Sequence, residues 1–155
     1  MRPRSARGRM FLALCVGGVA AVLWPATTRS GLDYRVSRKP IRLYEKAVHF
    51  LSRDLQLRRL TKEITAGASS EEQQLLSMFS WVTEHIRPTP PGFPVVDDHV
   101  LHIIIRGYGA DDQRTEVFVT LAGYAGLRAR VARLEPPAAP NHFLFVALVS
   151  CGINT

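Results

Sequence analysis

The sequence predicts an α+β fold in which helices pack on a small antiparallel sheet. Apolar residues recur every three or four positions over 41–60 and 71–86, the spacing of helices with one buried face. A third such stretch ends at Gly126, a residue type that commonly terminates helices. After it, residues 127–134 alternate between apolar and basic, and 142–149 are almost continuously apolar. These last two stretches predict strands.

Length and charge limit the class of protein. With 155 residues, an apolar leader included, the chain has room for one domain of about 110–125 residues. The net charge is +7, and ten Lys or Arg lie in residues 29–62 against three acidic residues. No aromatic interleaving or nucleic-acid motif accompanies this charge, so we expect no nucleic-acid partner. The basic stretch is expected to be solvated or to contact anionic lipid headgroups.

The N-terminus has the pattern of an export signal. Arginine-rich residues 1–9 precede an uncharged apolar run from Met10 to Trp24, as in a positive n-region followed by an h-region. We therefore expect a hydrophobic helix within residues 1–26. It is either a cleaved signal peptide or an uncleaved signal anchor, in which residues 10–26 form a transmembrane helix and contact the membrane. In both cases the protein is membrane-anchored or secreted, with its domain on the extracytoplasmic side.

The rest of the chain divides into a linker and one domain. Residues 27–40 are polar and basic and are interpreted as a linker, so the domain is expected to span 41–155. The first domain helix should bury an apolar face made of Leu43, Ala47, Phe50, Leu51 and Leu55. In the next helix, Ser69 with Glu72 or Ser70 with Gln73 can form a capping box.

A glycine-rich turn precedes the third long helix. Gly107 and Gly109 allow the chain to turn sharply before Asp111 or Asp112, either of which can cap that helix. Just upstream, Asp97 or Asp98 is expected to cap a short helix that ends near residue 106. Together with His99 and His102 these aspartates contain metal-ligand types. We interpret all four as caps and a solvated face, and expect no metal and no cofactor.

The order of these elements resembles that of bacterial transglutaminase-like domains. Five pieces carry the resemblance: Trp81 in a helix, Arg106-Gly107-Tyr108-Gly109 in the turn, Asp112-Gln113 at a helix start, Gly126-Leu127-Arg128-Ala129-Arg130 leading a strand, and His142 opening the next strand. It covers residues 75–149 and implies a papain-like core. In that family a cysteine at a helix N-terminus attacks an amide carbonyl, a histidine acts as the base, and an acid orients the histidine.

The resemblance assigns a position in this chain to each part of that site. Asp111 holds the nucleophile position and His142 the general-base position. The resemblance implies supporting roles for Gly109, Asp112, Gln113, Arg130 and Trp81. A carboxylate is a far poorer nucleophile toward an amide than a thiolate. The chain ends soon after the histidine strand, so the third catalytic residue is expected to be missing and the core incomplete at the C-terminus.

These observations predict an exported or membrane-tethered transglutaminase-like domain without cysteine-dependent acyl transfer. Such a pseudoenzyme would act as a binding or scaffold module for a peptide-like or cell-envelope partner. One alternative is a hydrolase or transferase of this superfamily that acts on peptide amide bonds through an altered Asp–His site. Another is a truncated, non-functional product. Without the next strand, residues 143–149 would form an exposed sheet edge.

Overall fold

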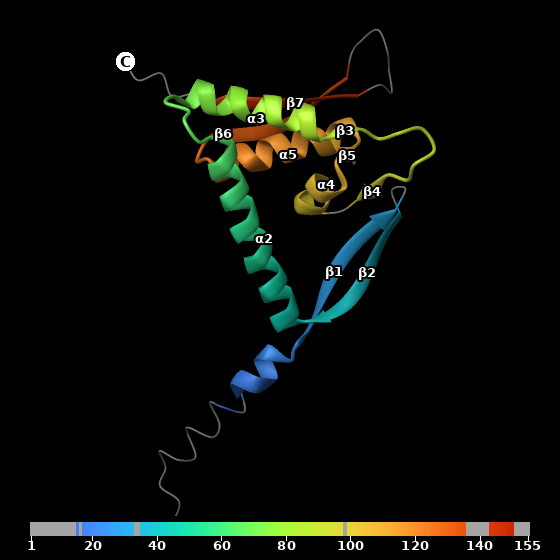
Figure 1. The fold of residues 1–155 in the computed structure, drawn as a ribbon. Helices are drawn as coiled ribbons and strands as arrows, with labels where there is room; N and C mark the ends of the chain where they lie inside the picture. The colour runs from blue at the N-terminus through green and yellow to red at the C-terminus, as the bar shows by residue number, and fades with distance from the viewer. Residues whose placement is uncertain (1–14, 16, 33–34, 98, 136–142, 151–155) are drawn as a thin grey trace, which may run out of the picture.

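The computed structural model describes residues 15, 17–32, 35–97, 99–135 and 143–150. Its long and short helices are α2 (Leu43–Ile64), α3 (Glu71–His85), α4 (Val100–Arg106) and α5 (Asp111–Tyr124). Its strands are β1 (Pro25–Leu32), β2 (Arg35–Arg42), β3 (Arg87–Pro88), β4 (Val96–Asp97), β5 (Tyr108–Gly109), β6 (Arg128–Leu134) and β7 (Leu144–Ser150). Figure 1 shows the helices gathered around α5, with the β6–β7 pair on one side and the β1–β2 hairpin extending away.

Helix α5 lies at the centre of the domain. It contacts α2, α3, α4, β6 and β7. Its residues Val117 and Leu121 are fully buried, and the neighbouring helices surround them with Leu57, Met78, Ile86 and Ile103. Burial of these side chains is the main stabilising contribution to the domain, since each fully buried side chain of this size contributes about 1.5–3 kcal/mol.

The end of α5 turns the chain into the sheet. Gly126 has a φ of 85°, and its N–H donates to Gly123 O at 3.1 Å, while the N–H of Leu127 donates to Ala122 O at 2.9 Å. These two bonds form a Schellman motif, which requires a left-handed residue at Gly126. The predicted helix stop at Gly126 is confirmed, and β6 follows at once.

The sheet is smaller and more divided than expected. Strands β6 and β7 pair antiparallel with Val131 opposite Ala147 and pack against α5, as predicted. The described residues form two further sheets, β2-β1-β4 and the short parallel pair β3-β5. The single antiparallel sheet of the prediction was therefore too simple. Short pairs such as β3-β5 have no hydrophobic alternation from which they could be predicted.

Residues 27–40, which were predicted to be a linker, belong to a β-hairpin. Strands β1 and β2 form a continuous antiparallel hairpin in which Thr27 pairs with Pro40 and Thr28 with Lys39. Nearly every β2 residue is exposed. The hairpin buries neither face, so its sequence lacks the apolar alternation that marks most strands. Pro40 is tolerated because β2 is an edge strand.

The expected hydrophobic helix at 10–26 lies mostly outside the described residues. In the described part, residues 17–22 are helical and β1 begins at Pro25, so the helix does not extend to residue 26. Pro25 already pairs with Arg42 in the hairpin ladder. Within the described ranges, no helix has the length and apolarity needed to cross a membrane.

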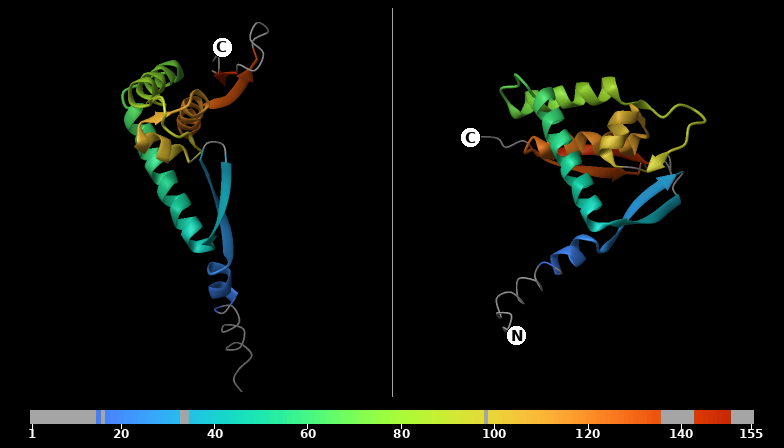
Figure 2. Two further views of the ribbon diagram at one scale, coloured as in Figure 1. Left: turned by 90° about the vertical axis from the view of Figure 1, so that its right-hand side faces the viewer. Right: turned by 60° about the horizontal axis from the view of Figure 1, so that its bottom comes forward.

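Helix α2 forms where predicted but buries different residues. Its expected apolar face, Leu43, Ala47, Phe50, Leu51 and Leu55, is exposed. The buried α2 residues are Leu57 and Thr61. The reason is tertiary: the C-terminal half of α2 reaches the core, whereas its N-terminal half extends toward the hairpin (Figure 2).

The N-terminal caps of α3 and α4 were also predicted. Ser70 caps α3 by accepting the N–H of Gln73 at 3.2 Å, so the cap at Ser70 is confirmed. The other half of the predicted capping box differs, because Gln73 Oε1 accepts the N–H of Ser69 at 2.8 Å. The cap of α4 is His99, whose Nδ1 accepts the N–H of Leu101 at 3.3 Å. Asp97 ends β4 instead of capping α4, and Asp98 lies outside the described residues.

Candidate functional site

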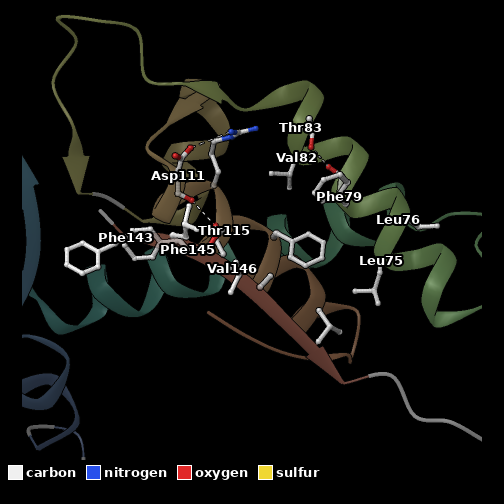
Figure 3. Close-up of a pocket in the computed structure, with 15 residues that line it drawn as sticks. Leu75, Leu76, Phe79, Val82, Thr83, Asp111, Thr115, Phe143, Phe145 and Val146 are labelled. Atoms are coloured by element: carbon white, nitrogen blue, oxygen red, sulfur yellow. Dashed lines mark hydrogen bonds and ion pairs between the residues drawn. The ribbon is translucent and has the colours of Figure 1, made fainter. Parts of the chain in front are cut away.

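A groove of about 670 Å³ lies between α3 and β7, with α5 at its base (Figure 3). Its lining is mainly apolar and includes Leu75 and Phe79 of α3, Phe118 of α5, and Phe145 and Val146 of β7. Polar groups gather at one end, where Asp111, Arg114 and Thr115 of α5 meet Thr83 of α3. An apolar cavity with a few polar groups at one end has the usual character of a ligand site.

Asp111 lies at the polar end of this groove. It is the first residue of α5, and its side chain is 84% exposed. The Oδ1 atom is 3.7 Å from Arg114 Nη1. The prediction that Asp111 or Asp112 caps α5 is wrong, since the cap is Ala110. A carboxylate in the first turn is nevertheless favoured by the helix dipole.

Gln113 anchors the start of α5. Its buried side chain accepts the N–H of Ala110 through Oε1 at 3.1 Å. Its Nε2 donates to Val96 O at 2.6 Å, which ties the start of α5 to β4. Asp112 makes a local contact in which Oδ1 accepts the N–H of Gln113 at 2.9 Å. Gln113 therefore positions the helix end on which Asp111 stands.

Gly109 lies at a crowded corner, where even a methyl group would press on its neighbours. A Cβ atom built there would lie 3.2 Å from Gln113 Oε1 and 3.2 Å from Ile103 Cγ2. Through β5, Gly109 pairs with Pro88, and its carbonyl accepts the N–H of Thr89 at 3.1 Å. The glycine thus lets the turn pack closely against Gln113.

Two of the predicted supporting residues lie away from the groove. Trp81 is half-buried, packs against the core and stacks on His85, with ring centroids 4.5 Å apart. Arg130 is exposed on β6 opposite Leu148. Neither side chain lines the groove. The first is a packing residue and the second a surface residue of the sheet.

His142 lies outside the described residues. The next residue in the chain, Phe143, lines the same groove as Asp111. The side chain of Thr115 in α5 reaches towards β7. Its Oγ1 donates to Asp111 O at 2.8 Å and is 3.4 Å from Phe145 O. The start of β7 is thereby held beside the first turn of α5.

The sequence prediction missed Arg114 and Thr115. Arg114 is three-quarters buried, and its Nε atom is buried with no acceptor among the described residues. A spacing signal could have found both residues. Positions 111, 114, 115 and 118 lie on one face of a helix, at intervals of three and four, and all four line the groove.

The acidic and histidine-rich stretch at 97–102 is described only in part, because Asp98 lies outside the described residues. No group of three or more His, Cys, Asp or Glu side chains that could hold a metal ion occurs within the described ranges.

The family model of the transglutaminase-like superfamily matches residues 58–138, more than half of the chain. This chain belongs to the transglutaminase-like superfamily. The matched part of this transglutaminase-like domain includes α3, α5 and Asp111, whereas β7 and His142 follow it. No curated protein matches the chain. No solved structure matches it either.

Proposed function

We propose that this transglutaminase-like domain is a binding module that holds a peptide-like segment in its groove and lacks cysteine-dependent acyl transfer. The observation that carries the proposal is Asp111, exposed at the polar end of the groove. The resemblance places the family's cysteine at this position. None of the described residues that line the groove is a cysteine.

The chemistry of the groove favours binding over acyl transfer. A thiolate attacks an amide carbonyl readily and forms a thioester, whereas a carboxylate is a weak nucleophile toward amides. Of the remaining polar lining, Arg114 can donate hydrogen bonds to a bound backbone. The hydroxyl oxygens of Thr83 and Thr115 can accept them, because each hydroxyl already donates its proton to a carbonyl of its own helix. Apolar walls then supply contact area for side chains.

The direct test uses amine donors and glutamine-containing peptides. The purified protein should form no crosslinks and release no ammonia above background. Turnover above background would contradict the proposal.

The position of Asp111 can be tested with a thiol. In a background carrying Cys15→Ser and Cys151→Ser, Asp111→Cys should react with iodoacetamide about tenfold faster at pH 7 than a thiol in mid-helix, because the N-terminus of α5 stabilises the thiolate. Ser80→Cys, exposed in the middle of α3, is the matched control. Adding His142→Ala should slow the reaction of the position-111 thiol if the imidazole faces it. Equal rates of reaction with iodoacetamide at positions 111 and 80 would show that position 111 does not activate a thiol.

A second candidate function is hydrolysis of peptide amide bonds by Asp111 with His142. It is favoured by one observation, that Phe143, adjacent to His142, lines the groove with Asp111. It predicts peptide hydrolysis that both Asp111→Ala and His142→Ala abolish. We expect no hydrolysis in the unsubstituted protein, and finding it would select this second function.

We also propose that the domain is exported or tethered to a membrane through residues 10–26. The support is the arginine-rich segment before an uncharged apolar run. A periplasmically active reporter enzyme fused after residue 155 should be active in a bacterial host, and inactive when Arg2, Arg4, Arg7 and Arg9 and the apolar run are deleted. Activity of the reporter without the leader would contradict export by this segment.

A further inference from the structure

One edge of β7 is open in the described structure. The strand pairs with β6 along its other edge, and no described strand pairs with this one. Sheet edges are normally protected by charges, prolines or bulges. The β7 sequence LFVALVS contains no charged residue and no proline. Its unpaired backbone groups are therefore available to another strand.

The groove runs along this open edge. Successive strand residues point to opposite faces of a sheet, so a cavity above one face would contact every second residue. The groove instead contacts each residue from Phe143 to Ala147. Across it stand Leu76 and Phe79 of α3, both largely exposed. Figure 3 shows α3 and β7 running in opposite directions along the two sides.

The polar end of the groove contains an unsatisfied donor. Arg114 Nε is buried without an acceptor among the described residues, and the ion pair of this guanidinium with the exposed Asp111 is long at 3.7 Å. This end lies beside Phe145, at the start of β7. A strand added antiparallel to β7 would arrive here with its carboxyl end. A carboxylate at that point would supply the acceptor that Arg114 Nε lacks.

We propose that an extended apolar peptide segment of a partner protein adds to β7 as an antiparallel strand, with its free carboxyl terminus at Arg114. The inference rests on the proposed function, because it specifies how the groove binds a peptide. An acyl chain would fill the apolar space but would leave the β7 backbone unpaired. An added strand pairs with the backbone of β7, covers the apolar walls of the groove and places a carboxylate at Arg114. The uncharged lining between the two ends requires an uncharged segment.

The test uses the full chain and a fluorescein-labelled peptide, Lys-Lys-Thr-Val-Thr-Phe-Thr-Val, with a free carboxyl terminus. Fluorescence anisotropy should show saturable binding. The C-terminal amide should bind about tenfold more weakly, since its terminus is uncharged. A peptide with proline at the first valine and at the phenylalanine should not bind, because proline removes ladder donors. Peptide binding should also slow amide hydrogen exchange in β7.

Variants locate the contact. Arg114→Gln should reduce binding of the acid peptide to that of the amide, and Ala147→Lys should abolish strand addition by placing a charge at the edge. Phe93→Ser is the control, because Phe93 is exposed and outside the groove, and it should bind as the unsubstituted protein does. Circular dichroism confirms that each variant is folded.

The outcomes separate the inference from the proposed function. Equal binding of the proline peptide, or binding that leaves β7 exchange unchanged, would overturn strand addition and leave a peptide-binding groove. Equal affinity of acid and amide would overturn the carboxyl end at Arg114. Failure of every peptide would overturn both proposals. A dimer that Ala147→Lys dissociates would assign the edge to a second copy, and binding of a fluorescent fatty acid alone would assign the groove to an acyl chain.

Discussion

At the residue scale, neighbouring side chains at the start of α5 have separate roles. Asp111 is exposed in the groove, whereas Gln113, two residues later, is buried and bonded to Val96 and Ala110. The hydrogen bonds of Gln113 hold the backbone at the start of α5 in place. The site therefore depends on an amide that takes no part in the chemistry of the groove.

Gly109→Ala should destabilise the domain by about 1–3 kcal/mol, because its new Cβ would compress Gln113 and Ile103. Urea unfolding monitored by circular dichroism measures the change. Gly123→Ala is the control: a Cβ there meets nothing within 4 Å, and Gly123 lies inside α5. That variant should gain about 0.5–1 kcal/mol from the lower cost of fixing alanine in a helix. A loss at position 123 equal to that at 109 would refute the close contact.

At the element scale, α2 separates helix formation from burial. Periodicity predicts both its existence and its length well, yet its apolar face at 43–55 stays exposed. Leu57 and Thr61 reach the core because they belong to the half of α2 that contacts α5 and α3. A helix of 22 residues is longer than the core it packs against.

Leu57→Ala should cost about 2–5 kcal/mol, since it leaves a cavity at a site that is 1% exposed. Leu55→Ala removes the same atoms two positions away, where the side chain is 67% exposed. It should change the free energy of unfolding by less than about 0.5 kcal/mol. Thermal unfolding of both variants gives the comparison. Similar losses would mean that the face of α2 carrying Leu55 is covered in solution.

At the scale of the whole molecule, one contact joins segments 70 residues apart. Tyr124, at the end of α5, donates to Asp54 Oδ1 at 3.1 Å, and Arg58 donates to Asp54 Oδ2 at 2.8 Å. The hydrogen bond from Arg58, aided by that from Tyr124, holds the pKa of Asp54 below its ordinary value. This small network connects the outer part of α2 to the core.

The pKa shift gives a pH dependence. Because the pKa of Asp54 is lower in the folded than in the unfolded chain, its contribution to stability is present above the unfolded pKa and is lost as pH falls through the folded pKa. Asp54→Asn should therefore lose less stability than the unsubstituted protein between pH 7 and pH 3 in urea unfolding. Glu63→Gln is the control, because the ion pair of Glu63 with Arg59 lies on an exposed face of α2. Identical acid profiles for Asp54→Asn and the unsubstituted protein would contradict the assignment.

The amino-acid sequence by itself determined the features of this protein that depend on local residue types and on motif order. The stop at Gly126 and the cap at Ser70 depend on residues close together in the chain, and the motifs from Trp81 to His142 are recognised by their order along it. They predicted the α+β class, the helices and the superfamily. The resemblance gave Asp111 the nucleophile position, and the structure shows that Asp111 lines the groove.

Non-local packing settled the rest. Periodicity states which residues share a face but not whether another element covers that face, so α2 was assigned the wrong buried residues. The β1–β2 hairpin buries neither face and has no pattern to detect. Arg114 and Thr115 gained their importance only because β7, about 30 residues later, lies beside α5. Burial and groove formation depend on contacts between distant segments, and these exist only in the folded chain.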